Sequence, residues 1–180
     1  MKKLLLLFGI CLSLTFQLTA QEKREQGKII KDYGQSFDVE NPDIKTDTKA
    51  ELKVIFDISQ SSEDKSVVNK QIETAARFLN MHAKEGMKPE QLHTAMTIHG
   101  GAWQDVMTNE AYKEKFGVDN PNLELINQLT EAGVDVILCG QTAGARGLNR
   151  TNVSPDVKFV LSAMTALLQY QNNGYRFIKF

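Results

Sequence analysis

Short runs rich in β-branched and apolar residues alternate with stretches of helical periodicity from residue 52 to the end of the chain. The runs span residues 52–58, 92–99, 134–139, 157–161 and 175–180, and the helical stretches span residues 67–83, 109–116, 121–132 and 164–171. Strands that alternate with helices form parallel sheets, because each helical crossover returns the chain to the end of the sheet at which the previous strand began. The pattern therefore predicts an α/β fold of three layers, in which a mostly parallel sheet of about five strands lies between helices.

The first twenty residues have the features of a secretory signal. Two lysines precede an apolar stretch at residues 4–14, and Ala20 offers a small residue for cleavage. The stretch is shorter than the roughly 20 apolar residues of a transmembrane helix. We therefore predict a signal peptide at residues 1–20, cleavage after Ala20, export to a periplasm and no stable membrane insertion afterwards. A retained membrane anchor is the alternative.

Residues 21–50 are polar and charged, with few apolar anchors. We predict an N-terminal arm here, followed by one domain at residues 51–180. The first part of the arm is expected to lack a fixed fold, and the later part to lie on the domain surface or on a neighbouring subunit. The chain has 21 Lys and Arg, 22 Asp and Glu, and a formal net charge of −1. It shows no clustered basic run, so we expect no nucleic-acid partner.

Cys139 is one of two cysteines, and it is the sole thiol if the leader with Cys11 is removed. It ends the run at residues 134–139 and opens a glycine-rich segment, residues 140–147, which we expect to be a loop. Ligands and chemistry gather where parallel strands end. A thiol at that edge can act as a nucleophile when N–H groups or cations lower its pKa. The alternative is a cysteine that packs as a small buried apolar residue.

His99 ends the second predicted strand, as Cys139 ends the third. Because parallel strands end at one edge, the imidazole is a candidate for activating the thiol. The alternative is a histidine held by a backbone partner. The residues that we expect to hold an anion or small ligand beside the sulfur are Gly100, Gly101, Gly140, Thr142 and Arg146.

The sequence does not indicate a metal or a cofactor. The three histidines, His82, His93 and His99, do not have the spacing of a ligand set, and one cysteine cannot form a zinc motif. The glycine spacing matches neither the dinucleotide fingerprint nor the P-loop. We therefore expect chemistry that depends on the protein's own side chains.

Four landmarks in order give the chain a resemblance to the DsrE/DsrF-like family, the small sulfur-relay proteins that include the YchN-like members. They are the strand at residues 53–58, the strand end at residues 98–101, the strand at residues 136–139 with its cysteine, and the segment at residues 167–175. The resemblance covers about residues 50–180. It implies a flavodoxin-like fold, homo-oligomers that are commonly trimers or hexamers, and a persulfide-carrying cysteine that only Cys139 matches.

These observations predict a sulfur carrier or sulfurtransferase-like protein that accepts sulfane sulfur as a persulfide on Cys139, without a cofactor. Whether the sulfur is turned over or carried stoichiometrically is left open, as are the donor and the acceptor. The alternative is a non-catalytic module with the same fold, in which the crevice at the strand ends binds a small ligand, or an oligomer docks a partner, and the cysteine is incidental.

Overall fold

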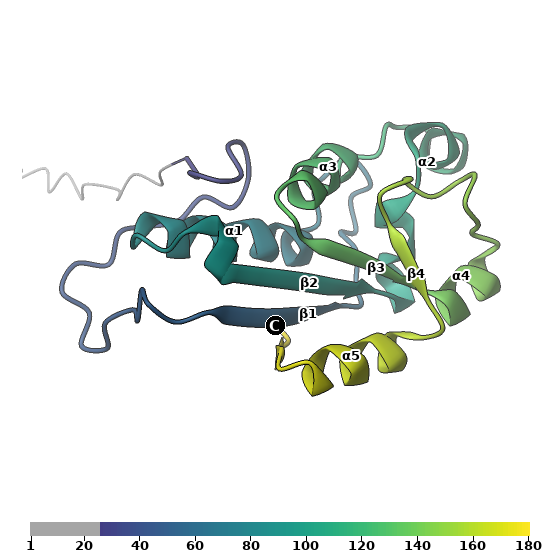
Figure 1. Ribbon diagram of the computed structural model, residues 1–180. Coiled ribbons are helices and arrows are strands. Elements are labelled where there is room, and N and C mark those ends of the chain that lie inside the picture. Colours follow the sequence, from purple (N-terminus) through teal and green to yellow (C-terminus); the bar gives the residue numbers. More distant parts are fainter. Residues whose placement is uncertain (1–25) are drawn as a thin grey trace, which may run out of the picture.

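The computed structural model describes residues 26–180, so the predicted leader and its cleavage site lie outside the described residues. A five-stranded sheet forms the centre of the domain, and all of its strand pairs are parallel, in the order β4-β3-β2-β1-β5. Figure 1 labels β1 to β4 of this sheet. The strands are β1 (Leu52–Ile58), β2 (Leu92–Ile98), β3 (Asp135–Cys139), β4 (Lys158–Val160) and β5 (Arg176–Ile178).

The connections between the strands are largely helical. The α-helices are α1 (Lys70–Lys84), α2 (Asn109–Phe116), α3 (Leu123–Glu131), α4 (Gly140–Arg146) and α5 (Ala163–Asn172), and the 3-10 helices are η1 (Pro89–Gln91) and η2 (Gly100–Val106). None of the helices within residues 26–180 has both the length and the apolar composition needed to cross a membrane.

The sheet separates two apolar clusters of unequal size. On one face α1 and α3 pack over the larger cluster, to which Phe56 and Leu138 contribute (Figure 1). On the other face α5 covers the smaller cluster, which contains Ile55, Ala95 and Ile137. The central strands are thus buried on both faces, as the strands of parallel sheets are. This arrangement confirms the predicted α/β fold with a parallel sheet between helical layers.

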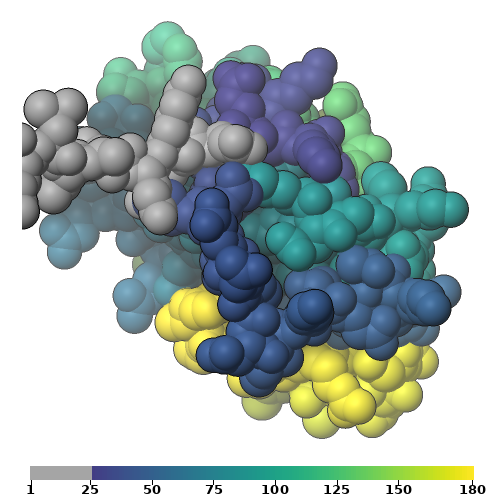
Figure 2. Space-filling view, turned by 90° about the vertical axis from the view of Figure 1, so that its left-hand side faces the viewer, coloured from purple at the N-terminus to yellow at the C-terminus, as the bar shows by residue number. Residues whose placement is uncertain are grey.

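The described part of the N-terminal arm, residues 26–50, is fastened to α1 through the buried side chain of Asn80. Its Oδ1 accepts hydrogen bonds from the N–H groups of Ile29 and Ile30 at 3.1 and 2.9 Å. Its Nδ2 donates to the carbonyl oxygens of Ile30 and Tyr33, both at 2.9 Å. Ile30 is buried in the larger cluster. Figure 2 shows the arm in purple and blue, running over the surface of its own domain.

The glycine-rich segment after Cys139 is a helix, which corrects our expectation of a loop. Glycine costs about 1 kcal/mol in a helix interior. Here the helix is held by burial, because Ala143 and the following Leu148 both pack into the larger cluster. Gly147, in the left-handed conformation with φ +69°, ends it. Tertiary packing therefore outweighs the weak local propensity of this segment.

Candidate functional site

Cys139 lies at the C-terminal edge of the sheet, where β3 passes into α4, and is 5% exposed. Its sulfur is surrounded by donors: the N–H and O–H groups of Thr142 and the N–H groups of Ala163 and Gln141. Burial raises the pKa of the Cys139 thiol, but these donors lower it by more, and the resulting pKa is below the ordinary value. The surroundings of the sulfur therefore favour the thiolate.

The close approach of two chain segments creates this arrangement. A Cβ atom on Gly140 would lie 2.6 Å from the carbonyl oxygen of Val160, so a side chain there would push α4 away from the end of β4. Because Gly140 has no side chain, the first residue of α5, Ala163, reaches the sulfur with its N–H group. On the other side, Thr142 Oγ1 accepts a hydrogen bond from Gly100 N–H at 3.3 Å.

His99 lies level with Cys139 on the neighbouring strand. Ile98 pairs with Leu138 in the parallel register, so the next residue of each chain segment follows at the same height. Side chains alternate along a strand, and Ile137, two residues before Cys139, faces α5. The side chains of Cys139 and His99 therefore project to the face that α5 covers. Within residues 26–180 no hydrogen bond joins His99 to the sulfur; His99 Nε2 instead contacts Asp57 Oδ1 at 2.7 Å.

Asp57, near the end of β1, completes a row of polar side chains across three adjacent strands. Its other carboxylate oxygen accepts a hydrogen bond from Lys179 Nζ at 2.7 Å, and Thr97 Oγ1 donates to Oδ1 at 3.3 Å. Burial raises the pKa of Asp57, but the bonds from Lys179 and His99 outweigh burial and hold the pKa below its ordinary value. Asp57 is therefore a carboxylate at neutral pH, and it fixes the orientation of the His99 ring.

The structure brings four of the five other predicted residues to this edge and leaves one away from it. Gly100, with φ +56°, and Gly101 pass close to the carbonyl oxygen of Ser59, where added Cβ atoms would lie 3.0 and 3.2 Å away. Gly140 and Thr142 adjoin the sulfur, as described above. Arg146 is the last residue of α4, with its guanidinium 5.6 Å from the centre of the Trp103 ring, and it is not among the groups that lower the pKa of Cys139.

A second buried carboxylate holds the loops behind this edge in place. Asp105, on η2, is fully buried and accepts hydrogen bonds from Ser61 Oγ at 2.6 Å, Asn69 Nδ2 at 2.7 Å and Asn122 Nδ2 at 3.3 Å. Burial raises the pKa of Asp105 to about 6, against the opposing effects of Ser61, Asn69 and Lys65. The three donors come from the loop after β1, the start of α1 and the start of α3, so one carboxylate joins three segments.

Sequence reasoning missed two features of the site. It did not include Asp57 among the site residues, whereas the carboxylate binds the side chains of His99 and Lys179. It gave Lys179 no role, because a lysine beyond the last strand has no local signal that points to a residue more than a hundred positions away. Within residues 26–180, no group of three or more His, Cys, Asp and Glu side chains is arranged to hold a metal ion.

Comparison with known proteins agrees with the fold and the landmarks. The model of the DsrE/DsrF-like family matches residues 53–180, and the chain belongs to this family. Among solved structures it is similar to the protein of unknown function MTH1491 from Methanobacterium thermoautotrophicum, with a TM-score of 0.52 and 16% sequence identity over 72% of this chain and 99% of that one. That likeness concerns the fold alone. None of the curated proteins matches the chain.

Proposed function

We propose that this protein carries sulfane sulfur as a persulfide on Cys139. Membership of the DsrE/DsrF-like family points to a role related to sulfur relay. The observation that carries the proposal is the set of donors around the sulfur, which lowers the thiol's pKa at the edge of the sheet. A cysteine that only filled space would need no such donors. We also propose that the chain is exported, as its first twenty residues predict.

The proposed reaction transfers one sulfur atom between thiols without net oxidation. The Cys139 thiolate attacks the terminal sulfur of a donor persulfide and forms a new S–S bond. The S–S bond of the donor breaks, and its electron pair leaves with the donor thiolate. The thiol proton of Cys139 passes to His99 and then to the departing donor thiolate, while Asp57 orients the imidazole. Delivery to an acceptor thiol is the same step in reverse.

Sulfur loading of the purified, reduced protein tests the proposal. We expect a persulfide donor to add one sulfur atom to the peptide that contains Cys139, observed by mass spectrometry, and a reductant to remove it. If instead the protein gains no sulfur and Cys139 reacts with a thiol label only after unfolding, the cysteine is a packing residue. The protein would then be a binding or assembly module of this fold.

Replacing His99 with Gln is expected to lower the rate of sulfur transfer at neutral pH by about 100-fold, the lower end of the range for a general base. Gln can keep the hydrogen bond to Asp57, so the fold should remain. The loss should shrink as the pH rises, because the thiol then ionises without help. The matched control is His93→Gln, at the other end of β2, where the imidazole contacts the exposed Glu51. An equal loss in both variants, or none in either, contradicts the role of His99.

We further propose that the domain assembles with copies of itself through the exposed face of α5. The exposed apolar ridge consists of Met164 and Leu168 on α5 together with Leu161, which lies just before the helix. It adjoins the helix end that meets Cys139. In the part of the chain that the structure describes, α5 alone covers this face of the sheet. The family resemblance implies homo-oligomers, which makes a second copy the expected occupant.

Sedimentation analysis tests the assembly. Leu168→Glu places a charge in the middle of the ridge, and we expect it to convert the oligomer into monomers. Val39→Glu is the matched control, because Val39 is an equally exposed apolar residue on the arm. A wild-type protein that is already monomeric, or an oligomer that survives Leu168→Glu, contradicts the proposed interface.

A further inference from the structure

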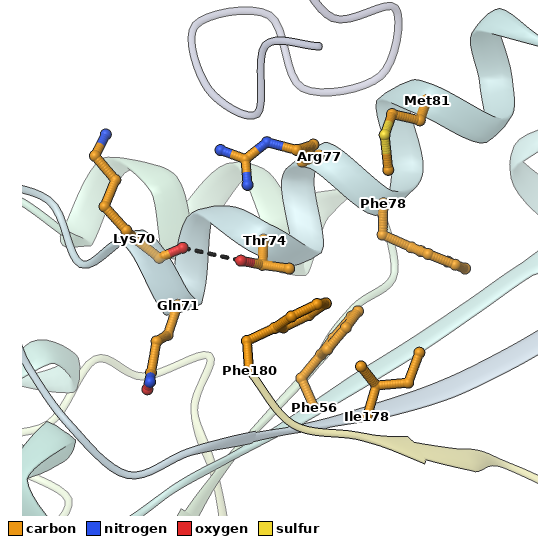
Figure 3. A pocket seen from close by; sticks show the side chains of 9 residues that line it. All are labelled: Phe56, Lys70, Gln71, Thr74, Arg77, Phe78, Met81, Ile178 and Phe180. Carbon is orange, nitrogen blue, oxygen red and sulfur yellow. Dashed lines mark hydrogen bonds between the residues drawn. The ribbon is translucent and has the colours of Figure 1, made fainter. Parts of the chain in front are cut away.

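A cavity of about 500 Å³ lies between α1 and β5, on the face of the sheet opposite to Cys139 (Figure 3). Its position follows from the strand order. β5 is one of the two edge strands, and α1 packs against β1 and β2, so the space above β5 is left unfilled by the described elements. The volume is within the range of about 300–1,000 Å³ that small-molecule sites have.

The walls of the cavity are apolar and largely aromatic. Phe56 contacts the ring of Phe78 edge-on, with centroids 6.0 Å apart, and stacks on Phe180 at 6.3 Å. Met81 and Ile178 complete the apolar lining. Phe180 is 76% exposed, an unfavourable place for a phenyl ring unless something covers it. Figure 3 shows the Phe56 and Phe180 rings below α1, facing the space that the cavity occupies.

The rim of the cavity is polar and positively charged. The lining residues from α1 are Lys70, Gln71, Thr74 and Arg77, and none of the nine lining side chains is acidic. Arg77 makes a single hydrogen bond to described residues, from Nε to the Gln35 carbonyl oxygen at 3.3 Å, so its terminal nitrogens are available.

From these features we propose that the cavity binds a small amphipathic anion, such as a medium-chain carboxylate, with its apolar body against the three phenyl rings and its acid group on Arg77. A planar guanidinium suits a carboxylate because it can form two parallel hydrogen bonds. Lys70 adds positive charge at the same rim, although it also pairs with Glu73 at 2.7 Å. The site is separate from the thiol and does not depend on sulfur carriage.

The test uses decanoate as the probe and the NMR amide signals of the purified protein as the readout. We expect saturable shifts concentrated in residues 70–81 and 176–180, and binding of decanol that is at least tenfold weaker. Arg77→Gln should weaken decanoate binding about tenfold, which corresponds to about 1.4 kcal/mol. Met81→Glu, which places a negative charge in the apolar wall, should abolish binding. Lys49→Gln, which removes an exposed charge on the arm, should leave it unchanged.

Three results would overturn the proposal. The first is the absence of shifts in the lining residues. The second is that decanol binds as tightly as decanoate, or that decanoate binding is unaffected by Arg77→Gln; either would mean that the rim does not recognise an anion. The third is the finding, from through-space NMR contacts, that the apolar segment at residues 4–14 of the chain itself fills the cavity and excludes the probe.

Discussion

Cys139→Ser should abolish sulfur loading completely while the domain stays folded. Serine has nearly the same size, and its hydroxyl can use the hydrogen bonds that Thr142, Gln141 and Ala163 direct at the sulfur. We therefore expect the free energy of unfolding to change by about 1 kcal/mol or less. The measurements are the intact mass after exposure to a persulfide donor and a urea unfolding curve of each protein.

Cys11→Ser is the matched control for this experiment in the full chain, because it removes the other cysteine of the sequence. It should load one sulfur atom, as the wild-type domain does. Loading that persists in Cys139→Ser would place the sulfur elsewhere. A Cys139→Ser protein that cannot fold would show instead that the thiol is needed for structure.

Asp105→Ala should lower the free energy of unfolding by about 3 kcal/mol at pH 7, since it leaves the donors of Ser61, Asn69 and Asn122 without their acceptor. The penalty should be larger at pH 4.5. Burial raises the pKa of Asp105 to about 6 in the folded protein, from 3.8 in the unfolded chain. Between pH 3.8 and about pH 6, the folded state holds a proton on Asp105 that the unfolded state has lost. The free energy of unfolding of the wild type therefore falls as the pH rises through this range.

The shift in the pKa of Asp105 corresponds to about 3 kcal/mol between pH 4 and pH 6, and a variant without the carboxyl group lacks this dependence. Urea unfolding of the wild type and Asp105→Ala at pH 4.5 and pH 7.5 measures the difference directly, because the other acids contribute equally to both proteins. Asp156→Ala, at an exposed position, is the control and should change stability by less than about 0.5 kcal/mol. If Asp105→Ala lowers the free energy of unfolding equally at both pH values, the pKa of Asp105 is the ordinary one.

The strands and the order of the elements could be predicted because local patterns determine them. The run at residues 52–58 and the helix at residues 109–116 coincide with β1 and α2. The helix at residues 140–146 could not be predicted in this way. Its glycines disfavour a helix locally, and what holds it is the burial of Ala143 and Leu148 against residues distant in sequence.

The site was predictable only in part for the same reason. Strand-end positions indicated that Cys139 and His99 share one edge, and the parallel register places them level. The strand order, in contrast, is a property of the whole sheet. It puts β1 beside β2 and so gives His99 a carboxylate partner, and it brings Lys179 to Asp57 from beyond β5. The position of Arg146 could not be predicted, because a loop was expected where a helix places this residue in its last turn, beside the Trp103 ring.

The rate of alkylation of Cys139 in the folded protein, followed from acidic to alkaline pH, tests most directly whether this edge of the sheet makes a reactive thiolate. We predict that native Cys139 reacts, that the rate rises with a midpoint below the pKa of an ordinary cysteine, and that unfolding in urea moves the midpoint upward to that value. The opposite result, in which the native thiol is inert at every pH and reacts only after unfolding, would contradict the proposed sulfur chemistry at Cys139.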